Sequence, residues 1–212
     1  MFDPILVPLD GSLLAECILP HVNAITRAFD AKVMLLRVMD KNQFMENAQL
    51  LDLVNWQINK AGAKLYLDKM SGRLKKSGIR VEATILEGLV ADTIAEFAQN
   101  QGAKLIIMSS HGRSGLSHWG ISSIAQKIIF SAPTSVLIIR AHLPADCDSD
   151  EQRYRQILVP LDGSRRAEFV LPMASLLARH HKSRIHLVHV VKAPEMARQL
   201  PLTREDLSLI HI

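Results

Sequence analysis

The sequence has few cysteines, few aromatic residues and no long apolar run. Its only cysteines, Cys17 and Cys147, form neither a metal-ligand spacing nor a disulfide framework, which fits a reducing compartment. Aromatic residues make up 5% of the chain and its basic residues are scattered, whereas nucleic-acid-binding proteins concentrate basic charge on one face and interleave aromatics. No segment has the length of a membrane span or the pattern of a signal peptide. We therefore expect a cytoplasmic protein that binds neither nucleic acid nor a membrane.

Four histidines near the C-terminus do not have the arrangement of a metal site. His186 and His189 are three residues apart on a predicted strand, so their side chains face opposite sides. We expect these two, together with His180 and His181, to be solvated, and we predict no metal-binding residues.

What the sequence does contain is a long internal repeat. Ile5–Ser12 recurs letter for letter as Ile157–Ser164, at an offset of 152 residues, and the correspondence continues without a gap to Val38 and Val190. A period of this length indicates duplicated domains rather than a solenoid of small repeats. We expect a complete domain over residues 1–142, a linker over 143–153, and the N-terminal part of a second domain over 154–212.

The apolar pattern of the first copy predicts five strands that alternate with four helices. Ile5–Leu9 has the continuous apolar run of a strand buried on both faces, and Ser12 is placed to cap the next helix, although Pro20 interrupts that helix. Such alternation is typical of an α/β domain with a doubly wound, mostly parallel sheet. The other expected strands are 32–38, 79–85 at a sheet edge, 104–108 and 135–139, and the other expected helices are 48–76, 90–99 and 122–131.

The longest predicted helix, 48–76, has a marked apolar stripe and a clear end. Gly78 follows its last residues and is placed as the glycine that ends a helix. The apolar residues at helical spacing are Val54, Ile58, Ala61 and Leu65, continued by Leu67, Met70 and Leu74.

Two segments follow the first and fourth predicted strands, where doubly wound sheets bind ligands. They are Pro8–Ser12 and Ser109–Ser123, and the second is rich in glycine and serine and leads directly into a helix. The free amides at the start of a helix, with the positive end of its dipole, attract anions, and small residues let phosphate oxygens approach the backbone. These residues predict a phosphate-binding loop.

The same segments resemble the universal stress protein family. The resemblance covers the first domain and the start of the second, and it is carried by Val-Pro-Leu-Asp-Gly-Ser, Leu-Leu-Arg-Val, Glu87-Gly88, Met-Ser-Ser-His-Gly-Arg-Ser-Gly-Leu-Ser and Ala132–Ile138. It implies a Rossmann-like, open five-stranded sheet of HUP type with strand order 3-2-1-4-5 and helices on both faces. It also implies binding of ATP or a related adenine nucleotide, with or without Mg²⁺, in a sensor or regulator of the stress response.

The ATP-binding members of the family carry a pattern of Gly, two residues, Gly, nine residues, then Gly and Ser or Thr. Gly112 and Ser123 match this pattern, whereas Ser109 and Ser122 occupy the other two glycine positions. The resemblance places Asp10 and Val38 at the adenosine end and Gly112, Ser122 and Ser123 at the phosphates. The full set of candidate cofactor-binding residues is Pro8, Leu9, Asp10, Val38, Met108, Ser109, His111, Gly112, Arg113, Gly115, Ser122, Ser123 and Ile124.

Several of these residues have a simpler explanation in the fold. Val38 and Met108 each suit core packing, Asp10 suits capping of the loop after it as well as ligand binding, and surface solvation suits His111 and Arg113. A serine held at positive φ, at position 109 or 122, would cost about 1 kcal/mol or more.

The sequence favours a binding protein over an enzyme. It has no Gly-Lys-Ser/Thr phosphate loop and no Gly-x-Ser-x-Gly elbow, so we expect at most slow ATP hydrolysis. One alternative is a dimerisation module of the same fold that binds no nucleotide. Another is a phosphotransferase or hydrolase that uses His111 or Asp10. We expect at most one nucleotide site per chain and a homodimer paired through Ser135–Ile139.

Overall fold

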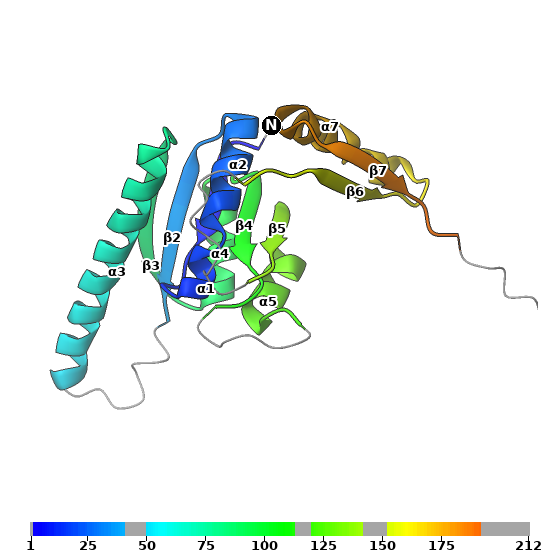
Figure 1. The fold of residues 1–212 in the computed structure, drawn as a ribbon. Helices are drawn as coiled ribbons and strands as arrows, with labels where there is room; N and C mark the ends of the chain where they lie inside the picture. The colour runs from blue at the N-terminus through cyan, green and yellow to red at the C-terminus, as the bar shows by residue number, and fades with distance from the viewer. Residues whose placement is uncertain (1, 41–49, 113–119, 142–151, 192–212) are drawn as a thin grey trace, which may run out of the picture.

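The first copy forms a five-stranded parallel sheet with the order β3-β2-β1-β4-β5 (Figure 1). The structure, a computed structural model, describes residues 2–40, 50–112, 120–141 and 152–191. The strands are β1 (Ile5–Pro8), β2 (Val33–Met39), β3 (Val81–Glu87), β4 (Leu105–Ser109) and β5 (Ser135–Ile139), and the helices are α1 (Leu13–Glu16), α2 (Leu19–Phe29), α3 (Leu50–Lys76), α4 (Val90–Asn100) and α5 (Ser123–Ser131). The predicted fold class, the strand order and the edge position of β3 are confirmed.

Helices cover both faces of this sheet, and each face has its own apolar core. On one face Ile5 and Val7 of β1 pack with residues of α2 and α3. On the other, Leu6 of β1 packs with residues of α4 and α5. Because consecutive side chains of a strand point to opposite faces, the short β1 anchors both cores, and it is buried on both sides as its sequence predicts.

The stretch after β1 is two helices rather than one, and Pro20 explains the division. The hydroxyl of Ser12 accepts a hydrogen bond from the Ala15 amide at 3.1 Å, so Ser12 caps α1 as predicted. That helix ends after one turn, and α2 starts with Pro20 in its first turn, where no intrahelical amide bond is lost.

Only part of the apolar stripe of α3 is buried in the core. Its C-terminal half buries Leu67, Met70 and Leu74, but Val54, Ile58 and Leu65 are exposed by 58%, 62% and 71%. The helix ends as predicted: Gly78 has φ +81°, and the amides of Gly78 and Ile79 donate to the carbonyls of Lys75 and Leu74.

The second copy repeats the start of the first. It comprises β6 (Gln156–Pro160), α6 (Arg165–Glu168), α7 (Leu171–His181) and β7 (Arg184–Val188), and β6 pairs with β7 in the register of β1 with β2. In Figure 1 it lies beside α2, at the end of the sheet where the strands begin. None of the helices in the described ranges is long and apolar enough to cross a membrane.

Candidate functional site

Asp10 ends β1 and organises the loop that follows. Its Oδ1 accepts hydrogen bonds from the amide and the hydroxyl of Ser12, at 2.9 and 2.6 Å, while Gly11 between them has φ +77°. The predicted loop-capping role of Asp10 is therefore confirmed. The second copy builds the same turn, because Asp162 accepts from the Ser164 amide at 2.8 Å and Gly163 has φ +81°.

Gly112 packs directly against the Asp10 carboxyl group. A Cβ atom at Gly112 would collide with Oδ2 of Asp10 and lie 2.9 Å from its Cγ. Since real Cβ contacts are not this short, only glycine fits at position 112 while Asp10 stays bonded to Ser12. The loops after β1 and β4, far apart in sequence, therefore meet at one point.

The residues between β4 and Gly112 are buried and internally bonded. The Ser109 hydroxyl donates to the His111 carbonyl at 2.7 Å, and the Ser110 hydroxyl accepts from the Ala141 amide at 3.0 Å and lies 3.1 Å from Nδ1 of His111. His111 is only 6% exposed. The prediction of a solvated His111 is wrong, because its side chain is buried beside the Ser110 hydroxyl.

Ser122 begins α5 without backbone strain. Its φ and ψ are −57° and 152°, its hydroxyl accepts from the Ala125 amide at 3.2 Å, and its own amide donates to the Ser110 carbonyl at 2.9 Å. Ser109 lies in β4, and neither serine is among the described residues with positive φ. The strain that serine would suffer at a left-handed position is therefore absent at both family glycine positions.

The start of α5 has backbone donors that no described residue accepts from. Ser123 and Ile124 are exposed, and their amides donate to no residue within the described part of the chain. α5 has nine residues, enough for the helix dipole to place partial positive charge at this end.

The remaining predicted residues divide into three groups. Val38 and Met108 are 9% and 7% exposed and belong to the α4–α5 core, so their packing interpretation is confirmed. Leu9 belongs to the opposite core, and Pro8 is half-buried beside it. Arg113 and Gly115 lie outside the described residues, and no conclusion about their contacts follows.

Two residues near this site were not predicted. Arg37 of β2 donates from Nη1 to the Leu9 carbonyl at 3.2 Å, at the point where β1 ends. Tyr66 of α3 has a buried hydroxyl with no partner among the described residues. Its pKa is raised, chiefly by burial and further by the nearby carboxylates of Glu16 and Asp10. A charged residue within an apolar strand was the available signal for Arg37, whereas nothing in the sequence pointed to Tyr66.

The described residues around this site do not form a metal-binding cluster. Within the ranges that the structure describes, no group of three or more His, Cys, Asp or Glu side chains is arranged to hold a metal ion.

One testable consequence concerns the cap of α5. We expect Ser122→Ala to lower the free energy of unfolding by about 1 kcal/mol, because the hydrogen bond to the Ala125 amide is lost. Ser122→Gly should cost only a few tenths of a kcal/mol, since glycine is tolerated at this helix position. Urea unfolding measures both, and equal losses in the two variants would contradict the cap assignment.

The fold and the paired loops place the chain in the class of doubly wound α/β proteins with a candidate anion site at the carboxyl ends of β1 and β4. The model of the universal stress protein family matches residues 1–140 and 153–209. The chain therefore belongs to the universal stress protein family, as its sequence predicts.

Individual relatives agree with this assignment. The chain is 27% identical over 155 residues to the universal stress protein MJ0577 of Methanocaldococcus jannaschii, covering 66% of this chain and 96% of that protein. A solved structure of MJ0577 aligns with a TM-score of 0.60 over 67% of this chain and 98% of its own.

Other solved structures share the fold at lower identity. A universal stress protein from Archaeoglobus fulgidus aligns over 99% of this chain and 73% of its own, with 18% identity and a TM-score of 0.71. A universal stress protein in complex with cAMP aligns over 66% of this chain and 98% of its own, with 19% identity and a TM-score of 0.51. An Arabidopsis thaliana family member with AMP bound aligns over 70% and 97%, with 17% identity and a TM-score of 0.50.

Proposed function

We propose that the first copy binds ATP or a related adenine nucleotide where β1 and β4 end, and that the protein is a cytoplasmic sensor or regulator of the stress response rather than an enzyme. The observation that carries the proposal is the start of α5. There the amides of Ser123 and Ile124, which bond none of the described residues, follow a strain-free Ser122 in the loop region that packs Gly112 against Asp10.

The phosphate end of the nucleotide would lie at α5. Backbone amides at a helix N-terminus donate hydrogen bonds to phosphate oxygens, and the helix dipole favours their negative charge. The exposed Ser123 adds a hydroxyl donor, and the Ser122 hydroxyl, which accepts from the Ala125 amide, still has its own proton to donate. When Mg²⁺ accompanies the nucleotide, it supplies further charge neutralisation at the phosphates.

The adenosine end would lie over the loop after β1. Asp10 keeps its Oδ1 on Ser12 and its Oδ2 against Gly112, so its main contribution is to hold the two loops together. Val38 and Met108 are packed in the core, and they would offer apolar edges to the adenine rather than specific hydrogen bonds. The half-buried Pro8 would border the same surface.

The comparisons support the ligand class. Structures of the same fold contain cAMP or AMP, which are both adenine nucleotides. The second copy repeats the Asp10–Ser12 turn at Asp162–Ser164, but the described residues contain no counterpart of β4 and α5 in that copy. We therefore propose one nucleotide site per chain.

The proposed assembly is a homodimer formed through β5. This strand is an edge of the sheet, and its Val136, Leu137 and Ile138 are only half-buried. An edge strand offers unpaired backbone donors and acceptors to a second copy. Light scattering at micromolar concentration should report twice the chain mass, and a monomer would contradict this part of the proposal.

Calorimetric titration with ATP tests the proposal. We expect one site per chain with a dissociation constant in the micromolar range, about −8 kcal/mol. Ser109→Gly and Ser122→Gly, which restore the family glycines, should change that constant less than about threefold, because neither serine is strained. Absence of binding heat at two temperatures would overturn nucleotide binding and favour the dimerisation module.

A further inference from the structure

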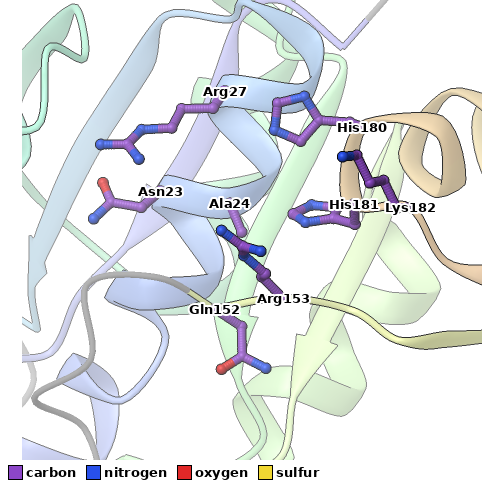
Figure 2. Close-up of a pocket in the computed structure, with 8 residues that line it drawn as sticks. All are labelled: Asn23, Ala24, Arg27, Gln152, Arg153, His180, His181 and Lys182. Carbon is purple, nitrogen blue, oxygen red and sulfur yellow. The ribbon is translucent and has the colours of Figure 1, made fainter.

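A cavity of about 250 Å³ lies between the two copies, at the end of the sheet opposite the candidate nucleotide site. Figure 2 shows it between α2, which contributes Ala24 and Arg27, and the end of α7, which contributes His180, His181 and Lys182. Asn23 of α2, together with Gln152 and Arg153 just before β6, completes the lining. A neighbouring cavity of about 560 Å³ shares part of this lining and adds Arg155 and Arg184. No carboxylate among the described residues lines either cavity.

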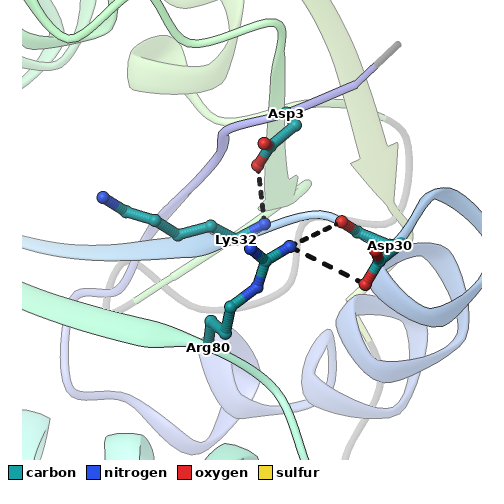
Figure 3. Close-up of polar contacts among 4 residues, drawn as sticks. All are labelled: Asp3, Asp30, Lys32 and Arg80. Atoms are coloured by element: carbon teal, nitrogen blue, oxygen red, sulfur yellow. Dashed lines mark hydrogen bonds and ion pairs between the residues drawn. The ribbon is translucent and has the colours of Figure 1, made fainter.

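The corresponding corner of the first copy has balanced charge (Figure 3). Asp3 accepts from the Lys32 amide at 2.7 Å, and Arg80 donates to the Asp30 carbonyl at 2.9 Å. The Lys32 ammonium pairs in turn with Glu82 at 2.8 Å. Acidic and basic groups therefore alternate where β1, β2 and β3 begin.

The second copy keeps the backbone of this corner and changes its charge. At the offset of 152 residues, Arg155, Lys182 and Arg184 occupy the positions of Asp3, Asp30 and Lys32. Lys182 ends α7 with φ +55° just as Asp30 ends α2 with φ +48°, and its amide bonds the last turn in the same way. Two acids have thus become bases, and in the described residues Arg155, Lys182 and Arg184 form no ion pair.

The second copy also has polar aromatic residues where the first copy has a pair of phenylalanines. Phe2 and Phe29 meet edge to face with ring centroids 5.0 Å apart, and Tyr154 and His181 repeat this geometry at 5.0 Å. The Tyr154 hydroxyl lies 2.9 Å from Nδ1 of His21 in α2, which ties the second copy to the first. Burial raises the pKa of Tyr154 to about 12, so its hydroxyl keeps its proton at neutral pH.

Two buried polar atoms around the first cavity lack partners. Asn23, which is 5% exposed and lines the cavity, has no partner for Oδ1 among the described residues, and Nε2 of His181 has none either. A buried polar atom without a partner costs about 1–3 kcal/mol. A water molecule can donate to Oδ1 of Asn23, whereas Nε2 of His181, when it carries a hydrogen, can donate to an anion.

We propose that these two adjoining cavities, which share Arg153, His181 and Lys182, bind a small phosphate-class polyanion such as pyrophosphate. Guanidinium groups bind phosphate oxygens in pairs, and an ammonium group adds a compact charge. Sites for whole drug-sized ligands occupy about 300–1,000 Å³, so the first cavity suits a phosphate chain better than a complete nucleotide. The site does not depend on the nucleotide site of the first copy.

Protonation of the His181 imidazole favours a bound anion, so binding at this site is expected to be linked to protonation of that ring. The pKa of His181 is held below its ordinary value, first by burial and next by His180, with Arg153 adding to the effect. A bound anion opposes these effects and raises that pKa, so binding takes up protons. Calorimetry in buffers of different ionisation heat measures the proton uptake.

Calorimetric titration of the full chain with pyrophosphate at low ionic strength tests the site. In Arg155→Asp/Lys182→Asp, which restores the acids of the first copy, we expect the affinity to fall at least tenfold. Aspartate tolerates left-handed backbone better than lysine, so position 182 should fold normally. The matched control Lys64→Glu/Lys69→Glu makes the same charge change at exposed positions of α3 and should alter the affinity less than twofold.

Two results would overturn the proposal: no pyrophosphate binding by the unmodified chain, or equal weakening in both double variants, which would indicate a general charge effect. Saturation with AMP separates the two sites, because the pyrophosphate isotherm should not change if nucleotide binds elsewhere. Gly112→Ala should likewise retain pyrophosphate binding. Loss of nucleotide binding alone would therefore count against the first site only.

Discussion

Leu6→Ala is expected to lower the free energy of unfolding by about 3 kcal/mol, whereas Leu158→Ala, the same residue of the repeat, should lower it by less than about 1 kcal/mol. The two leucines occupy identical local sequence, but Leu6 is 0% exposed and Leu158 is 65% exposed. Removing a buried leucine side chain costs about 2–5 kcal/mol through lost burial and the cavity left behind. An exposed leucine has little burial to lose.

Urea unfolding of the two variants beside the unmodified chain measures this difference, with Leu158→Ala as the matched control. Leu6 packs against Met34 and Ile106 in the α4–α5 core, whereas the described residues contain no counterpart of β4, α4 or α5 to cover Leu158. Equal losses would contradict the account, because they would mean that Leu158 is covered in solution as Leu6 is.

Gly112→Ala is expected to weaken ATP binding at least tenfold and to lower the free energy of unfolding by about 1–3 kcal/mol. The added methyl group would collide with the Asp10 carboxyl, and forcing an extra carbon into a packed site costs an amount of this size. Either Asp10 leaves Ser12 or the loop after β4 moves away from β1. Either change would displace the residues after β4 and, through them, the N-terminal amides of α5.

Gly72→Ala is the control for this variant. Gly72 lies within α3, and an added methyl group there would meet no atom within 4 Å beyond its own helical backbone. Alanine is more stable than glycine in a helix by about 1 kcal/mol, so we expect this control to be slightly more stable than the unmodified chain and to bind ATP unchanged. If Gly112→Ala bound ATP with unaltered affinity, the contact between Gly112 and Asp10 would not contribute to nucleotide binding.

The fold of the first copy could be predicted because its local signals agree with one another. Continuous apolar runs defined the buried strands, and Ser12 and Gly78 marked where helices begin and end. The exposure of Val54, Ile58 and Leu65 could not be predicted, because periodicity shows that a helix has an apolar stripe but not how far its partner extends. At about 1.5 Å per residue the 27 residues of α3 span about 40 Å, whereas the seven residues of β2 span about 23 Å.

The candidate site could be predicted in outline but not in its contacts. The sequence pattern placed Asp10 and Gly112 at the same edge of the sheet, yet their direct contact depends on how β1 and β4 are paired. His111 is buried beside Ser110, which a polar loop sequence does not reveal. The basic cavity between the copies required the packing of α7 on α2, although the internal repeat had already aligned Asp30 with Lys182.

Hydrogen exchange with and without saturating ATP tests the central claim most directly, because it reports both whether the nucleotide binds and where. We predict slower exchange at the amides of residues 10–12, 109–112 and 122–125, with no change at the equivalent turn, 162–164, of the second copy. Unchanged exchange throughout the chain, or protection confined to the second copy, would contradict a nucleotide site at the carboxyl ends of β1 and β4.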